Sequence, residues 1–152
     1  MRVADVMTQA SISDSPTDTL RDAAHLMWHE QTGSLVVLDG ADLVGIITER
    51  DILKAAAHGA DMDGLTVGQA MTTEVVTTTA DTSIHDAARL MAQHWIRHLP
   101  VVDDDKLVGM LSQRDVMGLF ASLRSEPGDV EIESDKLVRA RRLVRIEQGD
   151  LD

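Results

Sequence analysis

The sequence predicts an α+β fold made of two tandem β-α-β-β-α repeats. The main observation is a stretch, residues 43–53, that returns as residues 107–117 after an offset of 64 residues. Aligning residues 3–54 with 67–118 needs no gap and gives 16 identities in 52 positions. Each copy of the stretch begins as a short apolar run, typical of a buried strand, and then reaches a hydroxyl residue that can start a helix. We therefore expect two half-sized units that share a core.

Composition and charge narrow the class of protein. Hydrophobic residues make up 43% and aromatic residues 2% of the chain, so eight Met must supply part of an aliphatic core. The net charge of -12 would repel nucleic acid and anionic membranes. There is no Cys, hence no disulfide framework and no thiolate nucleophile. No apolar run is long enough for membrane insertion, and the expected location is cytoplasmic.

The first half of each repeat contains a short helical turn, a strand and a helix. The turn precedes Met7-Thr8 or Met71-Thr72, and the strand is predicted around Ile12 in the first copy and around Val75-Val76 in the second. Thr19 can cap the following helix in the first copy. The residues expected on the buried helix faces are Leu20, Ala23, Ala24 and Met27 in the first copy, and Ile84, Ala87, Ala88 and Met91 in the second.

The second half of each repeat contains two strands and a closing helix. The strands are predicted at 35–38 and 43–47 in the first copy, and at 99–102 and 107–111 in the second. A Gly- and Asp-rich linker, 58–65, joins the copies. The predicted organisation is repeat one at 1–60, repeat two at 61–124 and a tail at 125–152. Five cations of the tail, Lys136, Arg139, Arg141, Arg142 and Arg145, lie in a stretch for which we predict a helix, exposed or packed on a partner.

Two strand-to-helix corners are the first candidate sites. Thr48 precedes Asp51 by three residues, and Ser112 precedes Asp115 in the same way. This spacing places a hydroxyl, free backbone N–H groups and a carboxylate together, where small phosphorylated ligands often bind. The same spacing is also that of a capping box, in which both side chains only satisfy the helix N-terminus. Asp22 and Asp86, which follow Thr19 and Ser83 by three residues, are interpreted as caps.

The repeated motifs resemble those of a pair of cystathionine-β-synthase (CBS) domains. The resemblance rests on the Met-Thr openings, the Asp-Ala-Ala helices, the segment 97–103 (Arg-His-Leu-Pro-Val-Val-Asp) and the two corners, and it covers about residues 1–124. It implies two repeats packed about a pseudo-two-fold axis, with adenosine-containing ligands in the clefts between them. It also implies a regulatory module, often a homodimer, and not an enzyme. No catalytic Ser/His/Asp arrangement or metal cluster is evident in the sequence.

The resemblance also implies the ligand contacts. The corner carboxylates of Asp51 and Asp115 would accept hydrogen bonds from ribose hydroxyls, beside Thr48 and Ser112. Arg97 and His98 would face phosphates; the first copy has Gly33 and Ser34 there, so unequal sites are expected. Arg97 could instead pair with a surface acid, and Arg50 and Arg114 are surface cations or secondary phosphate contacts. The full set of expected ligand-binding residues is Ile12, Thr48, Asp51, Val76, Arg97, His98, Pro100, Ser112, Arg114 and Asp115.

Other conspicuous residues are interpreted as structural. His25 and His29 share a helix face but lack a third metal ligand, so a solvated face is expected. Trp28 and Trp95, late in the two long helices, could stack on a base or fill a dimer contact, but they are expected to be packing residues. The leading hypothesis is a module that binds AMP, ADP or ATP, requires no cofactor, and signals to an unknown regulated protein. The alternative is a structural or dimerisation module with vestigial sites.

Overall fold

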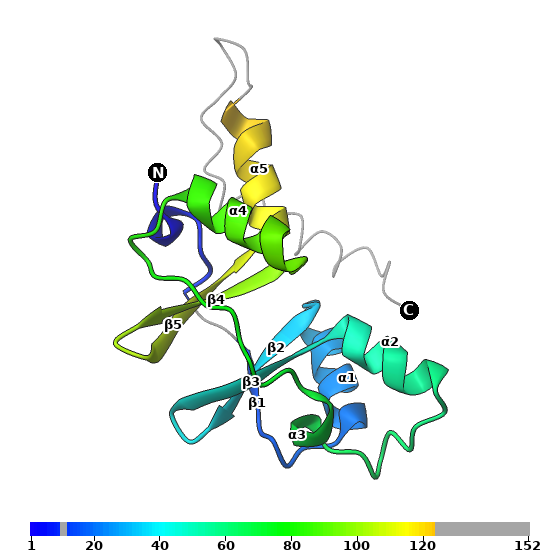
Figure 1. Ribbon diagram of the computed structural model, residues 1–152. Coiled ribbons are helices and arrows are strands. Elements are labelled where there is room, and N and C mark those ends of the chain that lie inside the picture. Colours follow the sequence, from blue (N-terminus) through cyan, green and yellow to red (C-terminus); the bar gives the residue numbers. More distant parts are fainter. Residues whose placement is uncertain (10–11, 124–152) are drawn as a thin grey trace.

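The computed structural model describes residues 1–9 and 12–123 and contains the two predicted repeats (Figure 1). The tail at 125–152, with its expected helix, lies outside the described residues. Repeat one contains η1 (Val3–Asp5), β1 (Ser13–Asp14), α1 (Leu20–Glu30), β2 (Ser34–Asp39), β3 (Asp42–Thr48) and α2 (Glu49–Ala57). Repeat two contains α3 (Val67–Ala70), α4 (Ile84–His94), β4 (His98–Asp103), β5 (Lys106–Ser112) and α5 (Gln113–Leu123).

The two hairpins have the same register. In β2–β3, Val36 lies opposite Ile46, and in β4–β5 the equivalent pair is Pro100 and Met110. Each hairpin carries one irregularity at the equivalent place, after Val37 and after Val101. The strands predicted at these positions are confirmed, each extended by one residue at either end.

The predicted opening strand is present in the first repeat, but the prediction of an equivalent strand in the second repeat is wrong. Strand β1 pairs in parallel with β2 through two residues, but the second copy has a single bridge between Thr78 and Val101. The next parallel bond would require the N–H of residue 100 as a donor to the carbonyl of Val76. Pro100 has no N–H, so the ladder ends at Thr78 and Val75-Val76 stays outside the sheet.

The long helices α1 and α4 start as the sequence predicts and bury most of the expected residues, although Ala24 and Ala88 are only partly buried. The Thr19 hydroxyl accepts the Asp22 N–H at 3.1 Å, and the Ser83 hydroxyl accepts the Asp86 N–H at 3.0 Å. Both acids therefore act as helix-cap residues. The fully or nearly buried side chains are Leu20, Ala23 and Met27 on α1, and Ile84, Ala87 and Met91 on α4.

The two repeats exchange their opening helices. Val3 of η1 packs in the core of repeat two with Leu99, and Val67 of α3 packs in the core of repeat one with Leu35. Figure 1 shows η1, in dark blue, beside α4, and α3 beside α1. The Val3 N–H donates to Thr82 O at 2.8 Å, and the equivalent Val67 N–H donates to Asp18 O at 2.8 Å. Each core is therefore incomplete without the other repeat.

After the opening helices, the chain crosses the second hairpin strand of the opposite repeat. Thr8 forms a bridge with Met110, and Thr72 forms the equivalent bridge with Ile46. All these exchanged contacts are related by the 64-residue offset, as expected for repeats packed about a pseudo-two-fold axis. In the described part of the chain, no helix has the length and apolar character needed to cross a bilayer.

Candidate ligand site between the repeats

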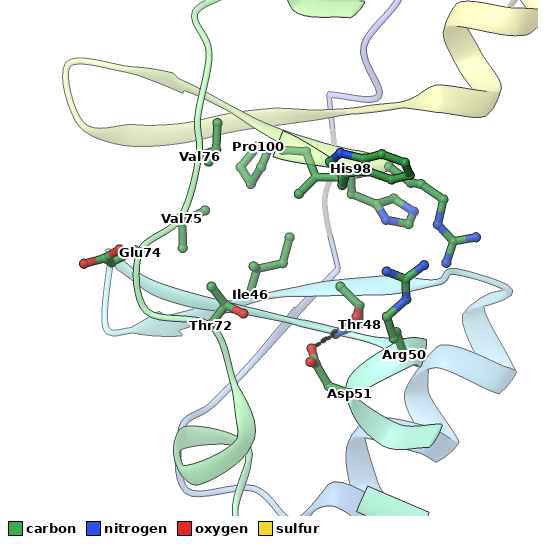
Figure 2. A pocket seen from close by; sticks show the side chains of 13 residues that line it. Ile46, Thr48, Arg50, Asp51, Thr72, Glu74, Val75, Val76, His98 and Pro100 are labelled. Carbon is green, nitrogen blue, oxygen red and sulfur yellow. Dashed lines mark hydrogen bonds between the residues drawn. The ribbon is translucent and has the colours of Figure 1, made fainter. Parts of the chain in front are cut away.

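A pocket of about 240 Å³ lies between the two repeats (Figure 2). Its walls come from the β3–α2 corner of repeat one, the crossing segment after α3, and the start of β4 in repeat two. It forms because the crossing segment is bonded to β3, with the Ile46 N–H donating to Thr72 O at 3.0 Å. The lining residues are Ile46, Thr48, Arg50, Asp51, Thr72, Glu74, Val75, Val76, Trp95, Ile96, Arg97, His98 and Pro100.

The structure brings six of the ten expected ligand-binding residues to this pocket. They are Thr48, Asp51, Val76, Arg97, His98 and Pro100. Ile12, Ser112, Arg114 and Asp115 do not line it; by the 64-residue offset they are the counterparts of Val76, Thr48, Arg50 and Asp51. Ligand contact by any of the ten remains a prediction.

The Asp51 corner satisfies the helix N-terminus and still keeps an oxygen for a ligand. Asp51 Oδ2 accepts the Thr48 N–H at 2.8 Å and the Thr48 hydroxyl at 3.1 Å. Figure 2 shows Asp51 and Thr48 together at one edge of the pocket, across from Val76 and Pro100. The other carboxylate oxygen makes no hydrogen bond among the described residues, so the capping and ligand-binding interpretations are compatible.

The Arg97 guanidinium lines the pocket and also pairs with an acid. Its Nη2 donates to Glu49 Oε1 at 2.9 Å, and this ion pair joins repeat two to the first turn of α2 in repeat one. Both side chains are about half exposed, at 49% and 58%, so the pair itself contributes little stability. A second, adjoining pocket of about 280 Å³ is lined by Glu49, Arg50, Leu53 and Arg97. An anion in either pocket would compete with Glu49 for Arg97.

His98 lies deeper and is less basic than an ordinary histidine. Burial lowers its pKa below 6.5, and the positive charge of Arg97 lowers this pKa further. The imidazole is therefore mostly neutral near pH 7, where it can donate or accept one hydrogen bond without adding charge. Of the two basic residues expected to face phosphates, only Arg97 supplies a full positive charge.

The equivalent corner in repeat two also forms a capping box. Asp115 Oδ2 accepts the Ser112 N–H at 2.9 Å and the Ser112 hydroxyl at 2.6 Å, while the Ser112 hydroxyl accepts the Asp115 N–H at 3.2 Å. Near this corner, Gly33 and Ser34 occupy the positions equivalent to Arg97 and His98. A side-chain carbon at Gly33 would lie 3.2 Å from the Glu49 carboxylate, which leaves little room for a larger residue. The cations near this corner are therefore fewer than in the first.

The prediction that both tryptophans are packing residues is wrong. Trp28 is 59% exposed and Trp95 is 89% exposed, and Trp95 lines the pocket. Large apolar residues are usually buried, but Trp28 lies on an exposed face of α1 and Trp95 lies just after the end of α4. Sequence reasoning also missed Ile46, Thr72 and Ile96, because only the contact between the crossing segment and β3 brings them together.

The candidate metal pair lies on a solvent-exposed helix face. His25 and His29 are both exposed on α1, and His29 lies 3.4 Å from the Glu30 carboxylate. Residues 1–9 and 12–123 contain no group of three or more His, Asp or Glu side chains arranged to hold a metal ion. The solvated helix face is the interpretation that these positions support.

Two interlocked repeats with a cleft lined by both of them define a class of paired regulatory domains. The family model for the CBS domain matches this chain twice, at residues 3–58 and 67–122. The chain belongs to the CBS-domain family, whose paired domains are regulatory and not catalytic. It is 41% identical over 116 residues to the CBS domain-containing protein YhcV of Bacillus subtilis, a match that covers 75% of this chain and 81% of YhcV.

Solved structures of CBS-domain pairs have the same fold. The pair from protein MJ0100, in complex with 5'-methylthioadenosine and S-adenosyl-L-methionine, has a TM-score of 0.76 and 29% identity, with 82% of this chain and 98% of that chain covered. CBSX2 in complex with AMP has a TM-score of 0.70 and 30% identity, with 82% and 98% covered. The fold expected from the resemblance is thus confirmed.

Proposed function

We propose that this protein is a regulatory module that binds an adenosine-containing ligand in the pocket between its repeats. The observation that carries the proposal is the meeting of an apolar wall, the free oxygen of Asp51 and the cation of Arg97 in one cleft formed by both repeats. A base, a ribose and a phosphate need these three environments. The adenosyl ligands of the MJ0100 pair and of CBSX2 support the same ligand class.

The ligand would act by holding the repeats in one relative arrangement. A molecule that contacts both repeats favours an arrangement only through its higher affinity for it, typically about 1–3 kcal/mol of coupling free energy. Displacing Glu49 from Arg97 would release the first turn of α2 and change the surface that this helix offers to a regulated protein. We also propose that the module regulates a partner protein and that it is located in the cytoplasm.

Thermal unfolding with and without AMP, ADP, ATP or S-adenosylmethionine tests the proposal. At about 100 times its dissociation constant, a ligand adds about 2.7 kcal/mol to the free energy of unfolding, which raises the melting temperature by roughly 5–10 °C. We expect such a shift with at least one of the four ligands. The absence of a shift with all four at millimolar concentration would favour the structural alternative.

The phosphate contact has its own test. Arg97→Ala should weaken AMP binding roughly 10-fold to 150-fold, because a charge-assisted hydrogen bond contributes about 1.5–3 kcal/mol, and it should leave adenosine binding nearly unchanged. Glu49→Gln removes the competing carboxylate and should strengthen AMP binding. Equal losses for AMP and adenosine in Arg97→Ala would show that Arg97 acts on the structure.

A homodimer is part of the same proposal. Apolar side chains on the two closing helices are exposed: Leu53 on α2 at 69%, and Met117, Phe120 and Leu123 on α5 at 65%, 55% and 64%. Leu53 and Met117 are equivalent positions, so both repeats present an apolar residue on the same helix face. We expect light scattering at micromolar concentration to give the mass of a dimer. A monomeric mass with and without ligand would remove this part of the proposal.

A further inference from the structure

Trp95 has a backbone conformation that its side chain disfavours. It is the residue that ends α4, with φ 55° and ψ 36°, in the left-handed region. Gly and Asn are the usual residues there, because a side-chain carbon crowds the following carbonyl oxygen. A bulky aromatic residue in this conformation is uncommon and suggests that the side chain has a use.

The helix end does not require an aromatic side chain. The equivalent residue of repeat one, Gln31, has nearly the same conformation, with φ 55° and ψ 41°. Its side-chain amide donates to the Trp28 carbonyl and so caps its own helix. Trp95 makes no side-chain hydrogen bond among the described residues and is 89% exposed. Its indole therefore stabilises neither the helix nor the core.

The segment that contains Trp95 differs from its counterpart at the positions that line the pocket. Residues 95–98 are Trp-Ile-Arg-His, whereas the equivalent residues 31–34 are Gln-Thr-Gly-Ser. All four residues of the second-repeat segment line the pocket. Arg97 and His98 are the polar part of this difference, and Trp95 is its aromatic part. Residues 95–98 therefore carry the aromatic and cationic side chains expected of a ligand-binding segment, whereas residues 31–34 do not.

The pocket needs an additional wall. Its volume of about 240 Å³ lies below the roughly 300–1,000 Å³ typical of small-molecule sites, so a bound nucleotide would extend beyond its mouth. Trp95 both lines this pocket and is almost fully exposed, which places its indole at the mouth. An exposed base can recover contact area there by packing on an aromatic face, which interacts with any base through its π system.

We propose that the Trp95 indole packs on the adenine ring of the bound ligand and gives the site its preference for ligands that carry a base. This inference rests on the proposed function and adds to it a residue that determines specificity. The backbone strain at Trp95 would then be retained because it holds the indole at the pocket mouth.

The test uses the full chain and compares AMP with ribose 5-phosphate, which has the sugar and phosphate but no base. Trp28→Phe leaves Trp95 as the sole tryptophan of the two in the chain, and we expect AMP but not ribose 5-phosphate to change its fluorescence. Trp95→Gly and Trp95→Gln should bind AMP about 5-fold to 100-fold more weakly and bind ribose 5-phosphate as the wild type does. Trp95→Gly should melt no lower than the wild type, because glycine tolerates the left-handed conformation.

Controls separate the other roles of an exposed tryptophan. Trp28→Gln removes an exposed indole that does not line the pocket and should leave AMP affinity unchanged. Unchanged AMP affinity in Trp95→Gly, an equal loss for ribose 5-phosphate, or a halved mass by light scattering would each overturn the proposal. If the wild type binds AMP and Trp95→Gly binds it equally well, the proposed function stands without this inference. If the wild type binds no adenosine ligand, both fail.

Discussion

Asp51 combines two roles at one carboxylate. One oxygen accepts both hydrogen bonds of the helix cap, and the other has no partner among the described residues and remains available for a ribose hydroxyl. The capping box therefore positions the ligand-binding oxygen. A substitution that keeps the cap and changes the second oxygen can separate these roles.

Asp51→Asn is that substitution. The amide oxygen can still accept the Thr48 N–H, so the melting temperature without ligand should fall little, by the loss of about 0.3–1 kcal/mol of charge–dipole stabilisation. The amide nitrogen would face the ligand in place of an acceptor, and AMP affinity should fall roughly 10-fold to 150-fold, equivalent to about 1.5–3 kcal/mol. Calorimetric titration measures the affinity. Asp86→Asn, at a cap away from the pocket, is the matched control, and equal AMP affinity in both variants would show that Asp51 is only a cap.

Asp14 carries an unusual carboxyl group. Burial, followed by the neighbouring Asp18 carboxyl group, raises its pKa from 3.8 to about 7. Asp14 Oδ1 accepts the Ser15 N–H at 2.9 Å, whereas its buried Oδ2 has no hydrogen-bond partner in the described structure. The folded state therefore keeps a proton here at pH values where the unfolded chain has released it.

This raised pKa predicts the pH dependence of stability. Between pH about 4 and about 7 the folded state binds more protons at Asp14 than the unfolded state, so the free energy of unfolding from this group falls as pH rises and is constant above about 7. Asn resembles the protonated acid in shape and does not titrate. Urea unfolding of wild type and Asp14→Asn should show the variant gaining relative stability from pH 4 to pH 7. A constant difference in the free energy of unfolding between the two proteins across that range would contradict the raised pKa. The titration of His98 contributes equally to both proteins and therefore does not affect this difference.

At the scale of elements, the exchange of opening helices depends on close backbone contact. The crossing segments pass over β3 and β5 at the one glycine in each strand, Gly45 and Gly109. A side-chain carbon at Gly109 would lie 2.7 Å from Thr8 O, and one at Gly45 would overlap the Met71 side chain. The glycines recur in both repeats because both crossings need the space.

Gly109→Ala tests this account. The added methyl group must push the backbone of the crossing segment away, so we expect a destabilisation of about 1–3 kcal/mol, measured by urea unfolding. Gly118→Ala is the control, because a side-chain carbon there meets no atom within 4 Å. Gly118 lies in helix α5, where alanine should stabilise by roughly 0.5–1 kcal/mol. Similar stabilities for the two variants would mean that the crossing segment is free to move.

At the scale of the whole molecule, the exchange makes the repeats depend on each other. Val3 completes the core of repeat two and Val67 completes the core of repeat one, and both are fully buried. Unfolding one repeat would therefore expose part of the other core. The pocket also depends on both repeats, because its walls come from both of them.

We therefore expect a single cooperative unfolding transition. Trp28 on α1, which is 59% exposed, reports on repeat one, whereas Trp95 is 89% exposed and too open to solvent to report on repeat two. In Trp95→Phe, whose remaining tryptophan is Trp28, fluorescence and circular dichroism should therefore change at the same urea midpoint. Two midpoints in one variant, one for fluorescence and one for circular dichroism, would show that the repeats unfold separately.

The sequence by itself determined the repeat, the hairpins, the helix caps and the two corners. These features depend on local spacing, such as Thr19 and Asp22 three residues apart, or on the comparison of one copy with the other. The same local logic identified Asp51 and Arg97 as candidates, with the family resemblance supplying their expected roles.

Only the tertiary structure decided how the two copies combine. The exchange of η1 and α3, the loss of the strand at Val75-Val76 and the exposure of Trp95 all depend on contacts or on open space between segments distant in the chain. Residue spacing carries no record of such contacts, because packing and backbone bonds between repeats act across the folded molecule. For the same reason, the sequence could name half of the pocket residues but could not place Thr72 beside Ile46.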